Sequence, residues 1–166
     1  PGADPLAVRR DGAGHEVATH GWSHTFVYRL SPEGFREELR RSIGLLESLS
    51  GERVMGHRAP YFSITRDSLW ALDIMAEEGI RYDSSVFPLK VKLYGVDGAP
   101  LGIYRPAAGD PGRHDPAGTL VEFPVAVHSV GGLRLPVAGG FYLRALPRFV
   151  FEAALAAYVR RRPASL

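Results

Sequence analysis

Residues 15–24 read HEVATHGWSH, a short strand-like run followed at once by a turn that carries two histidines. Residues 17–19 have the composition of a short buried strand. His20 and His24 are four residues apart, so a helical or tightly turned segment can bring both imidazoles to one metal ion. The alternative is two unrelated histidines in a loop. Because α/β enzymes place their sites directly after strands, this turn is the first candidate site.

The chain after this turn repeats the order of helix and strand. Serine, threonine and proline stand where helices begin, glycines stand where they end, and apolar residues recur at helical spacing between them. The pattern predicts helices from Ser31 to Gly51 and from Thr65 to Gly79, and strands over residues 53–55 and 80–82. This β-α-β-α-β order predicts a parallel sheet or an α/β barrel.

The second half of the chain is richer in loops. Residues 87–118 contain many prolines and glycines, but their apolar and aromatic residues predict a packed excursion rather than a linker. Residues 120–130 alternate, with four apolar residues on one side and Glu122 among those on the other. The glycines at 131–132 predict a hairpin turn, and Pro147 predicts the start of a final helix.

Composition excludes several classes of protein. The 166 residues are 45% hydrophobic and 23% charged, which suits one folded domain with a core. A net charge of +2 without a basic face argues against nucleic-acid binding, and no apolar run approaches the ~20 residues of a membrane span. The chain has no cysteine, so any metal must be held by imidazole and carboxylate groups.

A second candidate site is the RAPY stretch at residues 58–61, which also follows a predicted strand. Arg58 could orient a carboxylate, Pro60 fixes the turn, and the backbone N–H after that proline could bind an oxyanion. An ordinary strand-to-helix loop is the alternative. Asp83 ends the third strand, where it could line the rim or cap a turn. Parallel neighbours bring all these strand ends together at one rim.

Several of these stretches resemble a known family, the polysaccharide deacetylases (carbohydrate esterase family four, the NodB-homology domain). HEVATHGWSH and RAPY are similar to its second and third motifs. YDSSVFP (82–88), YG (94–95), VEFP (121–124) and LPVAGGFYLR (135–144) resemble the subgroup associated with exosortase and exopolysaccharide gene clusters. The resemblance covers nearly the whole chain from about residue 15 onward.

The resemblance implies a metal-dependent deacetylase on a distorted (β/α) barrel. A divalent metal, commonly zinc, would be held by His20, His24 and one aspartate, and would polarise the acetamide carbonyl. Tyr61 would offer its backbone N–H to the oxyanion, and Arg58 would orient the catalytic base. The candidate substrate contacts are Trp22, Pro60 and Tyr142; packing is the alternative for Trp22 and Tyr142.

The sequence departs from the family at both ends. Nothing before His15 matches the first motif, a strand ending Thr-Phe-Asp that supplies the third ligand and the base. Asp4 and Asp11 are too close to His20 and lack a preceding strand. The late histidine that protonates the leaving amine is also missing. His128 is a candidate substitute, but we expect it to be a packed or exposed strand residue. We likewise expect no catalytic role for His57, at a strand end, or for His114, in a loop rich in glycine and proline.

We therefore expect residues 1–166 to form a single partial catalytic domain of a longer deacetylase, incomplete at both ends. Residues 15–87 would carry the motifs, and residues 88–166 would add the loop, the hairpin and the final helix. This piece alone should show little or no turnover, because the base is missing.

The leading function is hydrolysis of an N-acetyl C–N amide bond on an amino-sugar polysaccharide or its precursor. The alternatives are hydrolysis of another non-peptide C–N bond, in a cyclic amide or ureide, or a non-catalytic remnant that binds carbohydrate. The basic end of the final helix, residues 160–162, also permits a membrane-surface role, with a solvated barrel-covering helix as the alternative. No signal peptide is visible, which favours a bacterial cytoplasmic location. The compartment, the natural glycan, the metal and the oligomeric state stay open.

Overall fold

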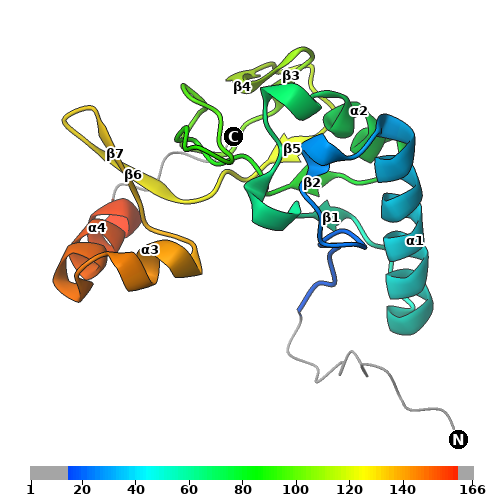
Figure 1. Cartoon of the computed structure of the whole chain (residues 1–166), viewed down its shortest axis with the longest axis horizontal. Coiled ribbons are helices and arrows are strands. Elements are labelled where there is room, and N and C mark those ends of the chain that lie inside the picture. The colour runs from blue at the N-terminus through cyan, green and yellow to red at the C-terminus, as the bar shows by residue number, and fades with distance from the viewer. Residues whose placement is uncertain (1–14, 161–166) are drawn as a thin grey trace, which may run out of the picture.

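The computed structural model describes residues 15–160, and its motif-bearing half is built on a parallel sheet (Figure 1). The three strands are hydrogen-bonded in the order β1-β2-β5, and Thr19 adds a parallel bridge to His57 at the edge. The elements of this half are the 3₁₀ helix η1 (Val27–Arg29), α1 (Pro32–Ser50), β1 (Gly56–His57), the 3₁₀ helices η2 (Pro60–Phe62) and η3 (Arg66–Ser68), α2 (Trp70–Glu77), β2 (Tyr82–Asp83) and β5 (Val121–Glu122).

Helix α1 begins and ends where local sequence chemistry predicts. The Ser31 hydroxyl accepts a hydrogen bond from the Gly34 N–H, and Pro32 occupies the first helical position. Gly51 ends the helix with φ of 69°, a left-handed conformation that favours glycine. Phe35 and Leu39 point into the core, and burying each contributes about 1.5–3 kcal/mol. Helices α1 and α2 lie together on one side of the sheet (Figure 1).

The strands begin later than the sequence predicts. The strand expected at 53–55 forms at Gly56–His57, and the strand expected at 80–82 forms at Tyr82–Asp83. Gly56 looks like a turn residue, but the ring of Tyr82 occupies the space that a Cβ would need, only 2.3 Å away. A glycine inside the strand therefore leaves room for the Tyr82 ring to lie against β1.

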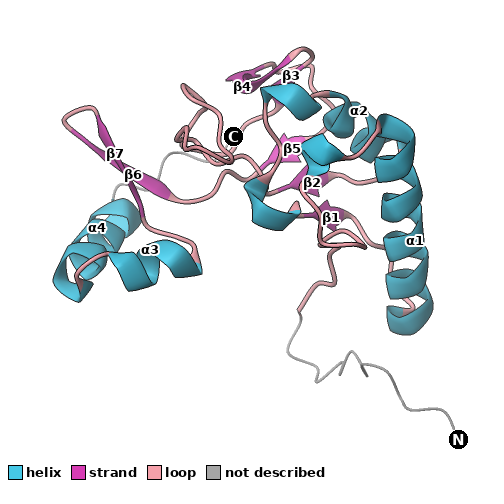
Figure 2. Ribbon diagram, viewed as in Figure 1, coloured by secondary structure: helices cyan, strands magenta, loops and turns pink. Residues whose placement is uncertain are grey.

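The C-terminal half forms two hairpins and two helices (Figure 2). The predicted turn at residues 131–132 is confirmed, and so is the helix after Pro147. The first hairpin and the helix over residues 140–145 were not predicted. The elements are β3 (Pro106–Ala107), β4 (Asp110–His114), β6 (Val127–Val130), β7 (Leu133–Pro136), α3 (Gly140–Ala145) and α4 (Arg148–Arg160).

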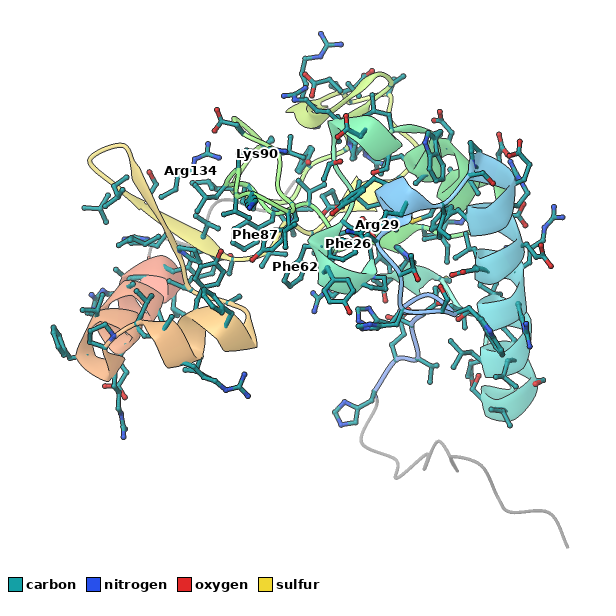
Figure 3. The ribbon with its side chains drawn as sticks, in the orientation of Figure 1. Phe26, Arg29, Phe62, Phe87, Lys90 and Arg134 are labelled. Carbon is teal, nitrogen blue, oxygen red and sulfur yellow. The ribbon has the colours of Figure 1, made fainter. Side chains whose placement is uncertain are left out.

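The excursion between the halves is packed, as predicted. Phe87 is fully buried, and its ring stacks on those of Phe62 and Tyr142. Phe62 and Phe87 lie close together in Figure 3. Arg134 of β7 donates hydrogen bonds to the carbonyls of Pro88 and Ala99, which ties the second hairpin to the excursion.

The prediction of one alternating strand over residues 120–130 was wrong. Strand β5 ends at Glu122, and β6 begins at Val127 in a different sheet. Glu122 is fully buried and Phe123 is 41% exposed, so the faces are reversed there, whereas Val125 and Val127 are buried as predicted. Glu122 is held inward by a hydrogen bond that its Oε1 accepts from the N–H of Val86, in the segment after β2.

The architecture is that of the predicted α/β class, with parallel strands joined by covering helices. Within residues 15–160 the sheet is open and no closed barrel forms. None of the described helices is both long and apolar enough to cross a membrane.

Candidate active site

The two motif histidines lie on a turn that is fixed to the edge of the sheet. Thr19 donates to the Gly56 carbonyl at 2.9 Å, and its own carbonyl accepts from the Arg58 N–H at 3.0 Å. The chain then turns at Gly21, where φ is 79°, and His24 itself has φ of 56°. The turn brings the His20 and His24 rings to 5.2 Å between centroids, at an angle of 70°. Both side chains are exposed.

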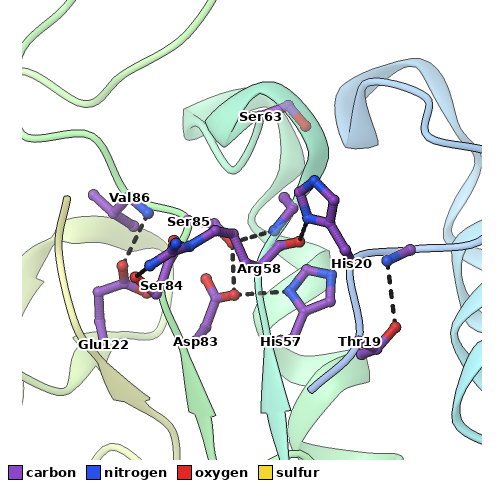
Figure 4. Close-up of polar contacts among 12 residues, drawn as sticks. Thr19, His20, His57, Arg58, Ser63, Asp83, Ser84, Ser85, Val86 and Glu122 are labelled. Carbon is purple, nitrogen blue, oxygen red and sulfur yellow. Dashed lines mark hydrogen bonds and ion pairs between the residues drawn. The ribbon is translucent and has the colours of Figure 1, made fainter. Parts of the chain in front are cut away.

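The tautomer of His20 follows from its hydrogen bond. Nδ1 lies 2.6 Å from the carbonyl oxygen of Arg58, and a carbonyl can only accept, so Nδ1 carries the proton (Figure 4). The neutral ring therefore keeps Nε2 as a free electron-pair donor. A backbone carbonyl that receives the other ring N–H is the usual second partner of a metal-binding histidine.

The two histidines fit a divalent metal as two of its ligands, because two neighbouring imidazoles suit zinc and similar ions. Between residues 15 and 160, no group of three or more histidines, carboxylates or cysteines is placed to hold a metal. The rejection of Asp4 and Asp11 as ligands concerns residues outside the described part of the chain. A metal bound here would thus take its third protein ligand from elsewhere.

Arg58 points along the rim toward the end of the next strand. Its Nε donates to the Ser84 carbonyl at 3.0 Å and its Nη2 to the Ser84 hydroxyl at 2.6 Å (Figure 4). Ser84 in turn donates to the Phe123 carbonyl at 2.7 Å. Among the described residues no carboxylate accepts from Arg58. Its predicted role of orienting a base stays a prediction.

Tyr61 has an unusual backbone conformation. Its φ is 58° and that of Phe62 is 52°, values that cost non-glycine residues about 1–3 kcal/mol each and cluster at functional sites. The Tyr61 ring stacks on Phe26 at 4.3 Å and meets the edge of His24 at 4.9 Å. Its backbone N–H has no hydrogen-bond partner within residues 15–160, so it is available to a ligand.

The three candidate substrate contacts lie in different surroundings. Trp22 sits on the histidine turn, 40% exposed, with the Arg41 guanidinium 3.9 Å above its ring. Pro60 is buried beside Gly21. Tyr142 is on helix α3 rather than in the expected loop, because the chain turns helical directly after Gly139.

Tyr142 belongs to an aromatic cluster that reaches the rim. Its ring stacks on Phe87 at 5.7 Å and its hydroxyl lies 3.2 Å from that of Tyr94. Phe62, the residue after Tyr61, also stacks on Phe87. Burial and the Tyr94 hydrogen bond raise the pKa of Tyr142 above its ordinary value. The structure thus brings His20, His24, Arg58 and Tyr61 together, with Trp22 on the same turn and Tyr142 linked through aromatic rings.

Sequence reasoning missed a buried polar network beneath this rim. Asp83, expected at the rim or as a turn cap, is fully buried and accepts hydrogen bonds from His57 at 2.7 Å and Ser85 at 2.6 Å (Figure 4). His57 is packed, and Glu122 is buried on the other side of Asp83. The available signal was His57 and Asp83, each just after a predicted strand; Glu122 carried no such signal, because it lay within the strand predicted over residues 120–130.

Comparison with known proteins places this geometry in a family. The family model of polysaccharide deacetylases matches residues 5–82, and a model described as a domain of unknown function (DUF3473), associated with exopolysaccharide-type deacetylases, matches residues 84–166. Residues 5–82 thus belong to the polysaccharide deacetylase family, and residues 84–166 belong to the DUF3473 family. The predicted resemblance is therefore confirmed.

Two curated proteins are similar to parts of this chain. A peptidoglycan deacetylase-like protein of Gibberella zeae is 35% identical over 92 residues, 55% of this chain and 26% of that protein. The peptidoglycan deacetylase of Helicobacter pylori is 28% identical over 74 residues, 45% of this chain and 24% of that protein. The matched segments span about a quarter of these curated relatives.

A solved structure shares the fold. The crystal structure of a Mycobacterium smegmatis protein assigned as a polysaccharide deacetylase superposes with a TM-score of 0.52 at 24% identity. The superposition covers 87% of this chain and 48% of that one. The predicted fold class is confirmed by this likeness, which at such identity concerns the fold alone.

Proposed function

We propose that this chain carries part of the active site of a metal-dependent deacetylase, which hydrolyses the N-acetyl C–N amide bond of an amino-sugar polysaccharide. One observation carries the proposal: His20 presents a free Nε2 beside His24, and the His24 ring lies 4.9 Å from the ring of Tyr61, whose backbone N–H has no partner among residues 15–160. Family membership gives the reaction class, since its members are hydrolases of this bond.

His20 and His24 would hold the metal, most simply zinc. When bound, such an ion supplies Lewis acidity toward the acetamide oxygen and lowers the pKa of coordinated water. The protein holds His20 in the correct tautomer through the Arg58 carbonyl before any metal arrives. This arrangement reduces the cost of ordering the ligand.

The Tyr61 N–H would donate to the oxygen that becomes negatively charged as the amide carbon turns tetrahedral. This N–H has no hydrogen-bond partner among residues 15–160, and it lies on the turn with left-handed conformations at Tyr61 and Phe62. One such donor typically contributes about 3–4 kcal/mol to transition-state stabilisation. Trp22, with Tyr142 behind the aromatic cluster, would contact the sugar ring.

An amino-sugar polymer is the substrate class that the relatives favour, since two of them are named for peptidoglycan deacetylation. An exopolysaccharide is consistent with the family that matches residues 84–166. The described residues contribute neither a general base nor a general acid at the rim, so we expect residues 1–166 alone to turn over little substrate.

The test has two arms. The first is zinc titration of the purified chain by calorimetry, in which His20→Ala and His24→Ala should each weaken binding by at least about 100-fold. His114→Ala is the matched control, because His114 is exposed on β4 and far from the turn in sequence. Tight zinc binding that survives both substitutions would sink the assignment.

The second arm is acetate release from chito-oligosaccharides by the full-length protein that the gene encodes. Acetate release lost in the same two variants supports the deacetylase. Release of ammonia or ring opening of a cyclic amide, without acetate release, would identify the alternative C–N hydrolase instead.

A further inference from the structure

Three ionisable side chains lie in one row beneath the rim, on three neighbouring strands. His57, Asp83 and Glu122 are paired in register across β1, β2 and β5. His57 is 2% exposed, and the other two are fully buried. Two carboxyl groups this close and this dry cannot both stay ionised without a large cost. The protonation states of Asp83 and Glu122 therefore need an explanation.

A count of hydrogen bonds shows where a proton is needed. Asp83 Oδ1 accepts from His57 Nδ1 and from the Ser85 hydroxyl, and Glu122 Oε1 accepts from the Val86 N–H at 2.9 Å. Asp83 Oδ2 and Glu122 Oε2 have no donor within residues 15–160. Both oxygens only accept when ionised, so one proton between them satisfies both.

The surroundings of the two carboxyl groups decide which of them holds this proton. Asp83 already accepts two hydrogen bonds, which favour its charged form, whereas Glu122 accepts one. Burial and the neighbouring Asp83 raise the pKa of Glu122 well above its ordinary value. The buried Tyr104, which bridges to Glu122, donates its hydroxyl to the Pro111 carbonyl and so does not serve this pair.

We propose that Glu122 stays protonated at neutral pH, that it donates from Oε2 to Asp83 Oδ2, and that this pair positions the turn that carries Tyr61. The link to the turn is Ser85. Its hydroxyl donates to Asp83 and accepts from the Ala59 N–H at 2.7 Å, which fixes the residue before Pro60. The importance of the turn rests on the proposed function, but the proton and the link to Ala59 do not.

Ser84, the residue before Ser85, also holds the segment that leads into the turn. Its N–H donates to the His57 carbonyl at 3.0 Å, and its side chain holds Arg58. The residues after β2 thus anchor Arg58 and Ala59, the two residues that lead into the turn. The strained backbone at Tyr61 and Phe62 requires such support, because left-handed non-glycine residues persist only where their surroundings hold them. Asp83 and Glu122 are accordingly positioning residues.

The experiment compares Glu122→Gln with Asp83→Asn in the chain of residues 1–166. A glutamine reproduces a protonated Glu122, since its amide donates to Asp83 and its oxygen accepts from Val86. An asparagine at 83 cannot accept at both oxygens, so it breaks the network. Infrared difference spectra at pH 7 should show the C=O band of a protonated carboxyl in the wild type and its loss in Glu122→Gln. Amide NMR shifts of Ala59 and Tyr61 should stay in place in Glu122→Gln and move in Asp83→Asn.

Ser85→Ala keeps the test decisive if Asp83→Asn fails to fold. It removes the link but leaves both carboxyls, so the Ala59 and Tyr61 amides should shift while the protonated-carboxyl band remains. Ile80→Val, a core change without a polar contact, is the control and should move neither signal. Absence of the band in the wild type, or Glu122→Gln shifting these amides as far as Asp83→Asn, would overturn the proton assignment. Unmoved amides in Ser85→Ala would overturn the positioning role. These readouts use neither metal nor substrate, so they are independent of the outcome for the proposed function.

Discussion

The two halves of the chain bury their apolar residues to different degrees. In the sheet half, α1 and α2 place Phe35, Leu39 and Met75 in one core with at most 3% exposure. In the C-terminal half, α3 has no buried residue and α4 has only Ala154, while Phe141 and Phe149 are 70% and 74% exposed. The candidate site lies on the well-packed half, where the rim residues need rigid support. The comparison predicts that matched substitutions will have very different effects in the two halves.

The largest expected difference is between two phenylalanines. Phe35 packs against His57 and Trp70 in the core, so Phe35→Ala should lower the free energy of unfolding by about 3–5 kcal/mol. Phe149→Ala, the same change on exposed helix α4, should alter it by less than about 0.5 kcal/mol. Urea denaturation followed by circular dichroism measures both. Comparable losses for the two variants would mean that Phe149 is covered in solution.

Helix capping gives the next, smaller contrast. Ser31 accepts from the Gly34 N–H at the start of α1, whereas α3 begins at Gly139 without a side-chain cap. Ser31→Ala should therefore cost about 1 kcal/mol of unfolding free energy. Ser48→Ala on the exposed side of the same helix is the control and should change it by less than about 0.5 kcal/mol. Equal effects at both positions would show that the cap does not anchor the helix.

Local signals were predictable from the sequence, and contacts between distant segments were not. The limits of α1 depend on Ser31 and Gly51, whose effects act within a few residues, and they are where the sequence puts them. The orientation of Glu122 was not predictable. Alternation shows that a strand has two faces, but which face is covered depends on neighbours far away in sequence. Here the neighbour is Val86, 36 residues earlier.

The candidate site likewise combines local signals, which were predictable from the sequence, with contacts between distant segments, which were not. The histidine turn and the RAPY turn could be located because each follows a strand and carries its own chemistry. Their common support at Asp83 and Ser85 could not, because it depends on the register between β1, β2 and β5. The helix around Tyr142 was missed because Gly139 and Gly140 resemble a loop, although Gly139 with φ of 95° only precedes the helix.

The smallest expected effect is electrostatic. It compares one ion pair from each half by how its contribution to the free energy of unfolding depends on pH. Glu78, the residue that follows α2, accepts hydrogen bonds from Arg40 and Arg36 of α1, and these hydrogen bonds lower the pKa of its carboxyl. A lowered folded-state pKa stabilises the fold above the unfolded value of about 4.5 and loses that contribution as the pH falls through the folded pKa. Glu78→Gln should thus lower the free energy of unfolding at pH 7 by about 0.2–1 kcal/mol.

The free energy of unfolding of Glu78→Gln should match that of the wild type once the pH falls below the lowered pKa. There the Glu78 carboxyl is protonated in both the folded and the unfolded state. Glu152, paired with Arg148 along the exposed face of α4, is the control. Glu152→Gln should cost no more than about 0.3–0.5 kcal/mol, and less in high salt, because both side chains lie in water. Urea titrations at a series of pH values measure both variants. A Glu78→Gln deficit that persists in acid would place its cause in packing between α1 and α2 rather than in charge.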